Sequence, residues 1–224
     1  DHLQQKIVSL RNVNILVLDE VDTMLDMGFL PQITQILKSV PKERQTMLFS
    51  ATLSREIMSI ASAYMKLPIR IEIAPTGTTV DSVSQDIFIV AREEKGRLLE
   101  KVLSQYTGST LIFVRTKYGA SRIARTIKQM GYAVAEIHSN RSFVQRKGAL
   151  EGFKTGQYRV LVATDIMARG IDVVGIELVI NYDLPSRAED YVHRIGRTAR
   201  AGLEGHAISF VTPAERSELR AIEW

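Results

Sequence analysis

The stretch Ile15-Leu-Val-Leu-Asp-Glu-Val-Asp22 joins an apolar run of strand length directly to a group of carboxylates. The same change from an apolar run to polar or charged side chains occurs at residues 47–52, 111–116 and 160–165. Continuous apolar strands are typical of parallel sheets that helices cover on both faces. Ligands of such sheets bind beyond the carboxyl ends of the strands. The pattern therefore predicts an α/β fold whose strand ends form a polyanion site.

Strand-like and helix-like segments alternate along the chain, in two blocks. The segment around residues 75–82 is rich in Thr and Gly and lacks apolar periodicity, so it is interpreted as a linker between domains at 1–74 and 83–224. Strands are expected at residues 15–18, 46–49, 69–73, 85–90, 110–114, 133–137, 159–163, 178–182 and 206–211. Helices are expected at residues 31–40, 55–65, 93–106, 118–130, 143–154, 188–195 and 214–223.

The 224 residues contain 45% hydrophobic and 24% charged residues, as an ordinary globular protein does. Cysteine is absent, which excludes a disulfide framework and a thiolate metal site and fits the cytoplasm. No apolar stretch is long enough to cross a bilayer, so no membrane partner is expected.

The net charge of +4 is unevenly distributed. Residues 1–80 carry 8 basic and 8 acidic side chains, so the whole excess lies in the second block. Between residues 115 and 147 eight Lys and Arg accompany a single acid, Glu136. A strip of this kind is typical of binding to a phosphate backbone, although exposed helix faces would explain it equally well.

The segment Tyr191-Val-His-Arg-Ile-Gly-Arg-Thr-Ala-Arg-Ala-Gly202 concentrates basic side chains in one helix-to-turn stretch. Arg197 and Arg200 are three residues apart, which on a helix would direct both guanidiniums to one side. Arg binds phosphate through a planar fork that matches the oxygens. A solvated basic helix is the alternative.

Asp19 and Glu20 stand where a nucleotidase places the carboxylate that holds Mg²⁺ through water and the one that orients the attacking water. Ordinary loop carboxylates are the alternative for this pair taken alone. The decisive observation is the order of six strings along the chain: Asp19-Glu-Val-Asp22, Asp26-Met-Gly-Phe29, Ser50-Ala-Thr52, Leu111-Ile-Phe-Val-Arg-Thr116, Ala163-Thr-Asp-Ile-Met-Ala-Arg-Gly-Ile-Asp-Val173 and His193-Arg-Ile-Gly-Arg-Thr-Ala-Arg200.

In these strings and their order the whole chain resembles the DEAD-box ATP-dependent RNA helicases. The resemblance implies RecA-like parallel sheets flanked by helices, with one truncated and one complete domain. It implies RNA-stimulated ATP hydrolysis coupled to local unwinding of RNA duplexes, with ATP and Mg²⁺ as cofactors. RNA would be bound through its backbone without regard to sequence, and protein partners or ribonucleoprotein particles are expected as well.

The resemblance also implies roles for individual residues. Asp19 would hold Mg²⁺ through water, and Glu20 would activate the water that attacks the γ-phosphate. The remaining roles implied are the following: Asp22 bonded to Ser50, Thr52 and His193 for coupling; Arg197 and Arg200 as arginine fingers; Gly170 and Asp172 at the nucleotide; and Arg115, Thr116, Arg146 and Thr164 on RNA phosphates.

Three substitutions depart from the family pattern. Val21 replaces an Ala, a small apolar change with little expected effect. Ala199 replaces a Gly, and its methyl group could be tolerated in a helix or could restrict a left-handed turn. Phe143 replaces a Gln three residues before Arg146.

A fourth departure concerns ATP binding. The sequence contains no Gly-x-x-x-x-Gly-Lys-Ser/Thr, the loop that cradles nucleotide phosphates. The chain is therefore expected to lack the N-terminal half of the first domain and to hydrolyse ATP poorly alone; a natural protein that has lost the loop is the alternative. Two rival functions are a non-catalytic fragment that binds RNA or a partner, and a DNA-directed motor.

Overall fold

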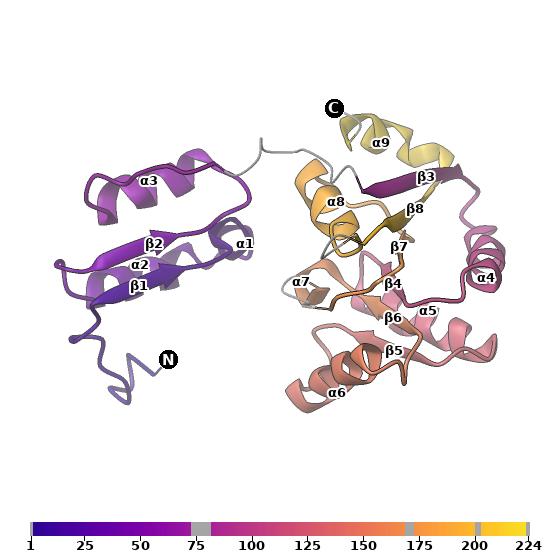
Figure 1. The fold of residues 1–224 in the computed structure, drawn as a ribbon, viewed down its shortest axis with the longest axis horizontal. Helices are drawn as coiled ribbons and strands as arrows, with labels where there is room; N and C mark the ends of the chain where they lie inside the picture. Colours follow the sequence, from indigo (N-terminus) through magenta and orange to yellow (C-terminus); the bar gives the residue numbers. More distant parts are fainter. Residues whose placement is uncertain (1, 73–81, 169–172, 200–202, 223–224) are drawn as a thin grey trace. The chain divides into compact units, whose positions relative to one another are not determined.

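The computed structural model describes residues 2–72, 82–168, 173–199 and 203–222 (Figure 1). The chain divides into two compact units, Asp1–Thr76 and Gly77–Trp224. The predicted linker at residues 75–82 lies almost entirely outside the described residues.

The smaller unit is built on two parallel strands. It contains β1 (Ile15–Leu18), α1 (Val21–Asp26), α2 (Leu30–Ser39), β2 (Gln45–Leu48) and α3 (Arg55–Tyr64). The strands pair in register from Ile15 opposite Gln45 to Leu18 opposite Leu48. Leu18 packs with residues of all three helices in the core, and Val21 is fully buried there.

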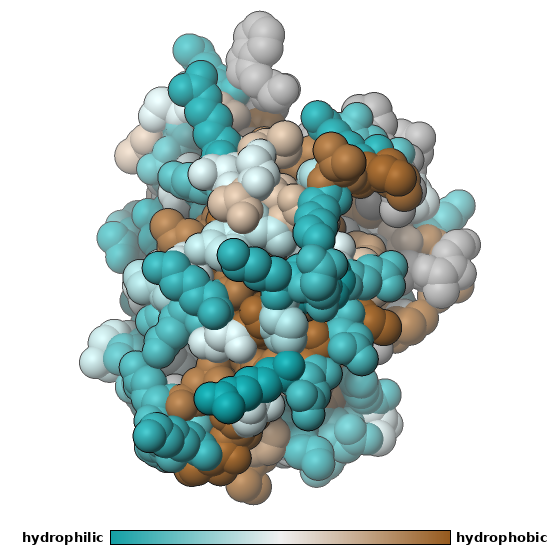
Figure 2. Space-filling model, turned by 90° about the vertical axis from the view of Figure 1, so that its left-hand side faces the viewer, coloured by the Kyte–Doolittle hydropathy of each residue, from teal (hydrophilic) through white to brown (hydrophobic). Residues whose placement is uncertain are grey.

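Two expectations for this unit are wrong. Residues 69–72 form no strand, and the side chains of Ile69 and Ile71 are 88% and 83% exposed. Helices do not cover both faces of the sheet, since Ile15 and Val17 on one face of β1 are exposed. Apolar side chains accordingly reach the surface between polar ones in the space-filling view (Figure 2). The alternation of Ile69 and Ile71 suits a strand, but a strand needs a hydrogen-bonded neighbour, and the described residues supply none there.

The larger unit contains a six-stranded sheet in the order β3-β8-β7-β4-β6-β5, with every pair parallel. Its elements are β3 (Val83–Ile89), α4 (Lys95–Gln105), β4 (Thr110–Phe113), α5 (Lys117–Gln129), β5 (Val134–Ile137), α6 (Phe143–Lys154), β6 (Val160–Ala163), α7 (Asp165–Ala168), β7 (Leu178–Asn181), α8 (Ala188–Ile195), β8 (Gly205–Val211), the 3-10 turn η1 (Pro213–Glu215) and α9 (Arg216–Ile222).

Alternate residues of the central strands enter two separate cores, one on each face of this sheet. Ile112 of β4 packs with residues of α4 and α5, whereas Leu111 and Phe113 pack with residues of α6 and α8. All four residues of β4, β6 and β7 are buried. The prediction of a parallel α/β sheet covered on both faces is thus confirmed for the larger unit.

The short helices α1 and α7 were not predicted. Each begins within three residues of the end of a strand, at Val21 after β1 and at Asp165 after β6. Helices of six and four residues are too short to show an apolar period. Among the described residues, no helix has the length and apolar character that crossing a membrane would require.

Candidate functional site

In the smaller unit, Asp19 and Glu20 follow β1 directly and both side chains are exposed. Glu20 precedes α1 with φ 49° and ψ 48°, in the left-handed region. Its backbone N–H donates to Asp19 Oδ1 at 2.9 Å. A non-glycine residue in this region costs on the order of 1–2 kcal/mol. The turn therefore holds two adjacent carboxylates at the carboxyl end of the strand at an energetic cost.

Asp22 ties the turn after β1 to the loop after β2. Its Oδ2 accepts hydrogen bonds from the backbone N–H groups of Ala51 and Thr52, both at 3.0 Å, and from Thr52 Oγ1 at 3.4 Å. The expected bond to the Ser50 side chain is wrong, because Ser50 Oγ is buried with no hydrogen-bond partner in the part of the chain described. His193 belongs to the larger unit, and its bond to Asp22 stays a prediction.

The Asp19 carboxylate fits the predicted Mg²⁺ role. Oδ1 receives one backbone hydrogen bond, and carboxylate oxygen is the donor that Mg²⁺ prefers. The described residues contain no group of three or more His, Cys, Asp or Glu that could enclose a metal. One or two carboxylates completed by substrate phosphates and water are the usual arrangement for Mg²⁺. Asp19 would thus be a single protein contact in a site that the nucleotide completes.

In the larger unit, the arginine segment does not continue as a helix. Helix α8 ends at Ile195 with Gly196 as its C-cap, and Arg197 follows in a turn. Arg197 therefore lies past the end of the helix, and the expectation that it belongs to a helix with Arg200 is wrong. Arg197 Nε donates to the carbonyl oxygen of His193 at 3.1 Å. Arg200, Gly170 and Asp172 lie outside the described residues.

Arg194, three residues before Arg197, is a structural arginine. Its residue is 2% exposed, and Nε and Nη2 bind both carboxylate oxygens of Asp165 at 2.5 and 2.8 Å. Nη1 donates to Asn181 Oδ1 at 3.1 Å and to the Asp183 carbonyl oxygen at 2.7 Å. The guanidinium also lies 5.0 Å from the centre of the Phe113 ring. Sequence reasoning missed this role, although Arg194 shares a helix face with the apolar Tyr191 and Ile195.

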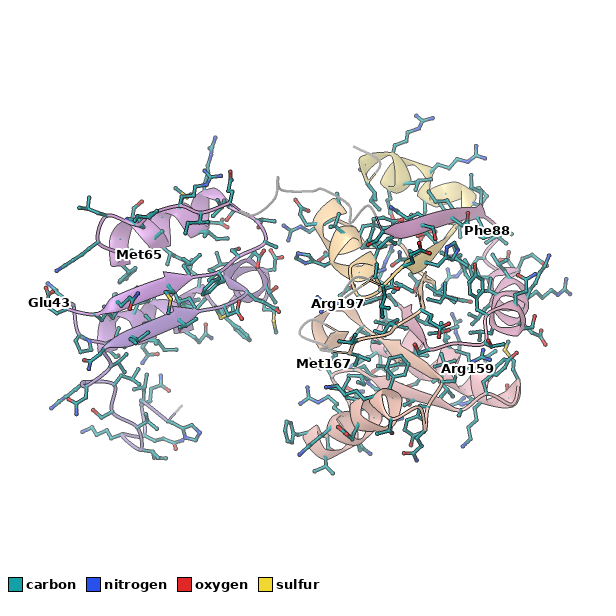
Figure 3. The ribbon with its side chains drawn as sticks, in the orientation of Figure 1. Glu43, Met65, Phe88, Arg159, Met167 and Arg197 are labelled. Carbon is teal, nitrogen blue, oxygen red and sulfur yellow. The ribbon has the colours of Figure 1, made fainter. Side chains whose placement is uncertain are left out.

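Ala199 has φ +55°, so the left-handed turn is present here, and not the helix that was the other alternative. The methyl group of Ala disfavours this conformation by roughly 1–2 kcal/mol. The turn comes two residues after Arg197, and Figure 3 shows Arg197 and Met167 of α7 on the same side of the larger unit.

Replacing Ala199 by glycine should stabilise the larger unit by up to about 1 kcal/mol, because the relief of strain exceeds the added entropy of the unfolded chain. The urea midpoint measures the change. Ala149→Gly, in the interior of α6, is the matched control and should destabilise by about 1 kcal/mol. A lower midpoint for Ala199→Gly would contradict the assignment of strain to this turn.

The predicted RNA residues gather at the carboxyl ends of two neighbouring strands, β4 and β6. Thr116 caps α5, where its Oγ1 accepts from the Gly119 N–H at 3.0 Å. Thr164 follows β6, and its N–H donates to the Ile137 carbonyl oxygen at 3.3 Å. Arg146 reaches the same region from α6, with Nη1 2.9 Å from Met167 Sδ. Phe143, one turn before Arg146, is 72% exposed.

Arg115 is held by the C-terminal elements of the unit. Its Nη2 donates to the Leu184 carbonyl oxygen at 3.1 Å and to Glu218 Oε2 at 3.3 Å, and lies 3.7 Å from Glu215 Oε1. Burial raises the pKa of Glu215. Hydrogen bonds from Thr212 and the charges of Lys95 and Arg115 together lower it by more than burial raises it, so the pKa of Glu215 is below the ordinary value. Contact of the Arg115 guanidinium with RNA would require it to leave these carboxylates.

Both units of the chain match models of known protein families. Residues 1–60 match the DEAD/DEAH box helicase family model, and residues 94–202 match the helicase conserved C-terminal domain. The chain belongs to the DEAD-box helicase family. The two matches include the carboxylate turn after β1 and the arginine segment after α8, the features described above in the smaller and larger units.

Several DEAD-box relatives match the full length of the chain. It is 44% identical to the ATP-dependent RNA helicase DbpA and 43% identical to the DEAD-box ATP-dependent RNA helicase CshA, both of Bacillus subtilis, and covers 47% and 45% of their lengths. A solved structure of S. cerevisiae Dbp5 bound to RNA and ADP BeF3 matches with a TM-score of 0.91 and 33% identity, over 100% of this chain and 60% of that one. The chain thus spans about half the length of the curated relatives it matches.

Proposed function

We propose that this protein is an ATP-dependent RNA helicase, in which RNA-stimulated ATP hydrolysis drives the local separation of short RNA duplexes. The observation that carries the proposal is the clamp made by Asp22. It holds the Ser50-Ala51-Thr52 loop against the turn that presents Asp19 and Glu20, so that two family motifs form one hydrogen-bonded edge.

For ATP hydrolysis, we assign Asp19 to Mg²⁺ through water and Glu20 to the attacking water. The exposed position of both carboxylates supports these roles. From the larger unit, Arg197 would stabilise the charge that develops on the transferred phosphoryl group. We keep Arg200 in the same role, His193 as a partner of Asp22, and Gly170 and Asp172 at the nucleotide, as the family resemblance implies.

For RNA, we assign phosphate contacts to Arg115, Thr116, Arg146 and Thr164. The support is their common position at the ends of β4 and β6 or on the helix that faces them. Phosphate contacts position the strand without reading bases. Binding should therefore be insensitive to sequence and should weaken steeply as salt increases.

We further propose that the 224 residues alone hydrolyse ATP poorly. Their sequence lacks the loop that supplies backbone N–H groups and a Lys to the nucleotide phosphates. Without that loop, Asp19, Glu20 and Arg197 have no positioned phosphate on which to act. A non-catalytic role in binding RNA remains the second candidate, which the basic strip between residues 115 and 147 favours.

RNA affinity as a function of salt tests the RNA assignments on the chain as it stands. Each phosphate contact on a single strand contributes about −0.7 to the slope of log K against log salt. Arg146→Gln should therefore reduce the slope by about 0.7, equally for RNAs of different sequence. Arg97→Gln, on the exposed side of α4, removes the same charge and should leave the slope unchanged. A slope equal for wild type and Arg146→Gln would contradict the assignment.

A further inference from the structure

A groove runs along the outer edge of the larger sheet, where β5 is the last strand. It has a volume of about 550 Å³ and is lined by residues of α5, of β5 and of the start of α6. Figure 1 shows α5 and α6 next to β5 at this edge. The residues assigned to RNA contact do not line this groove, so it is a separate feature.

The charge of the groove is positive. Arg125, Lys128 and Arg141 line it together with one acid, Glu136. Glu136 is already satisfied within the protein: it forms an ion pair with Arg141, and its Oε2 lies 3.2 Å from His138 Nε2. Burial raises the pKa of Glu136. Hydrogen bonds from Ser121 and Arg141 and the charges of Arg141 and His138 together lower it by more than burial raises it, so the pKa of Glu136 is below the ordinary value.

Arg125 and Lys128 are therefore not neutralised by the groove's carboxylate. Both are exposed on α5, three residues apart and thus on one side of the helix. Neither has an ion pair or a side-chain hydrogen bond with any other described residue. Lys117, at the start of the same helix, does have such a contact, since its Nζ donates to Asn140 Oδ1 at 3.0 Å. Two unpaired cations in one groove favour an anionic ligand.

The groove adjoins the proposed RNA site. Two of its lining residues, Arg141 and Gln145, lie on either side of Ser142, the N-cap of α6, and Gln145 immediately precedes Arg146. Helix α5 starts just after the carboxyl end of β4, and the other cations, Arg125 and Lys128, lie in its second half. Positive charge thus extends from the strand ends along β5.

We propose that this groove binds the backbone of the RNA strand beyond the carboxyl ends of the strands, with Arg125 and Lys128 each contacting a phosphate. The proposal rests on the RNA-binding function proposed above and extends it by a second set of contacts. Among the described residues, none that lines the groove is aromatic, so these residues offer no platform for base stacking. An extended row of cations suits a chain of phosphates better than a single nucleotide.

Single-stranded RNAs of two lengths test the proposal. An RNA of about 6 nucleotides occupies only the site at the carboxyl ends of β4 and β6, and one of about 20 nucleotides also reaches the groove. Arg125→Gln/Lys128→Gln should reduce the salt slope for the longer RNA by about 1.4, two contacts at about 0.7 each. Binding of the short RNA should not change. Arg97→Gln/Lys101→Gln on α4 is the charge-matched control and should alter neither.

The outcomes separate the groove from the function on which it rests. Both substituted residues are exposed, so the urea midpoint of the double variant should equal that of wild type. The groove proposal would be overturned if the groove variant and the α4 control lost equal amounts of the salt slope, or if the groove variant lost none on the longer RNA. The RNA function would still stand in that case, provided that wild type binds RNA. If wild type bound neither RNA, the RNA function itself would fail.

Discussion

Replacement of Arg194 by alanine is expected to destabilise the larger unit by about 3–5 kcal/mol, the cost of removing one partner from a buried ion pair. The reason is what remains after the substitution. Asp165 loses both of its bonds to the guanidinium, and the fully buried Asn181 loses a donor to its Oδ1. Because domains of this size are stable by only about 5–15 kcal/mol, much of the population should unfold at modest urea concentrations.

Urea denaturation followed by circular dichroism measures this change. Arg197→Ala is the matched control in the same segment, and it should cost less than Arg194→Ala, because Arg197 is only partly buried whereas Arg194 is buried. Arg194→Lys keeps the charge but cannot bind both oxygens of Asp165, so it should fall between the two. Equal destabilisation by Arg194→Ala and Arg197→Ala would show that the segment does not divide into a structural and a functional arginine.

Replacement of Arg197 by alanine is expected to reduce ATP turnover by about 10³–10⁵-fold, the range seen for arginine fingers. The measurement needs a complete nucleotide site. We would therefore join the phosphate-loop region of a DEAD-box relative to residue 1 and compare kcat of this chimera with and without the substitution. The large factor is expected because the guanidinium would act on charge that develops only in the transition state.

The control for this experiment is a variant of an arginine outside the site. Arg159→Gln suits this purpose, since Arg159 stacks on Tyr132 and donates to the Leu103 carbonyl oxygen at the amino end of β6, away from the carboxyl ends of the strands. It should retain turnover within a few-fold. If Arg197→Ala kept more than a tenth of the turnover while binding ATP normally, Arg197 would not be an arginine finger.

In the larger unit, the predicted ends of most strands and helices lie within two residues of the observed ones. The central strands β4, β6 and β7 are buried at every residue, and their continuous apolar runs are typical of a parallel sheet covered on both faces. The site also follows in outline, since polar residues after β1, β2, β4 and β6 lie at carboxyl ends of strands.

What the sequence could not predict depends on contacts far apart in the chain. Arg194 shares a helix face with Tyr191 and Ile195, but local pattern does not reveal its ion pair, because the partner Asp165 lies 29 residues away in the chain. Nor does local pattern show that Ile69 and Ile71 lack a neighbouring strand. The left-handed Glu20 depends on the short connection from β1 to α1, because α1 begins at the next residue.

ATP hydrolysis by the chimera that contains a phosphate loop, with and without RNA, shows most directly whether these residues belong to an RNA helicase. We expect slow turnover without RNA, strong stimulation by RNA of any sequence, little stimulation by DNA, and almost no turnover by the 224 residues alone under either condition. A folded chimera that binds ATP and RNA yet shows no RNA-stimulated turnover would contradict the proposal that these residues belong to an ATP-dependent RNA helicase.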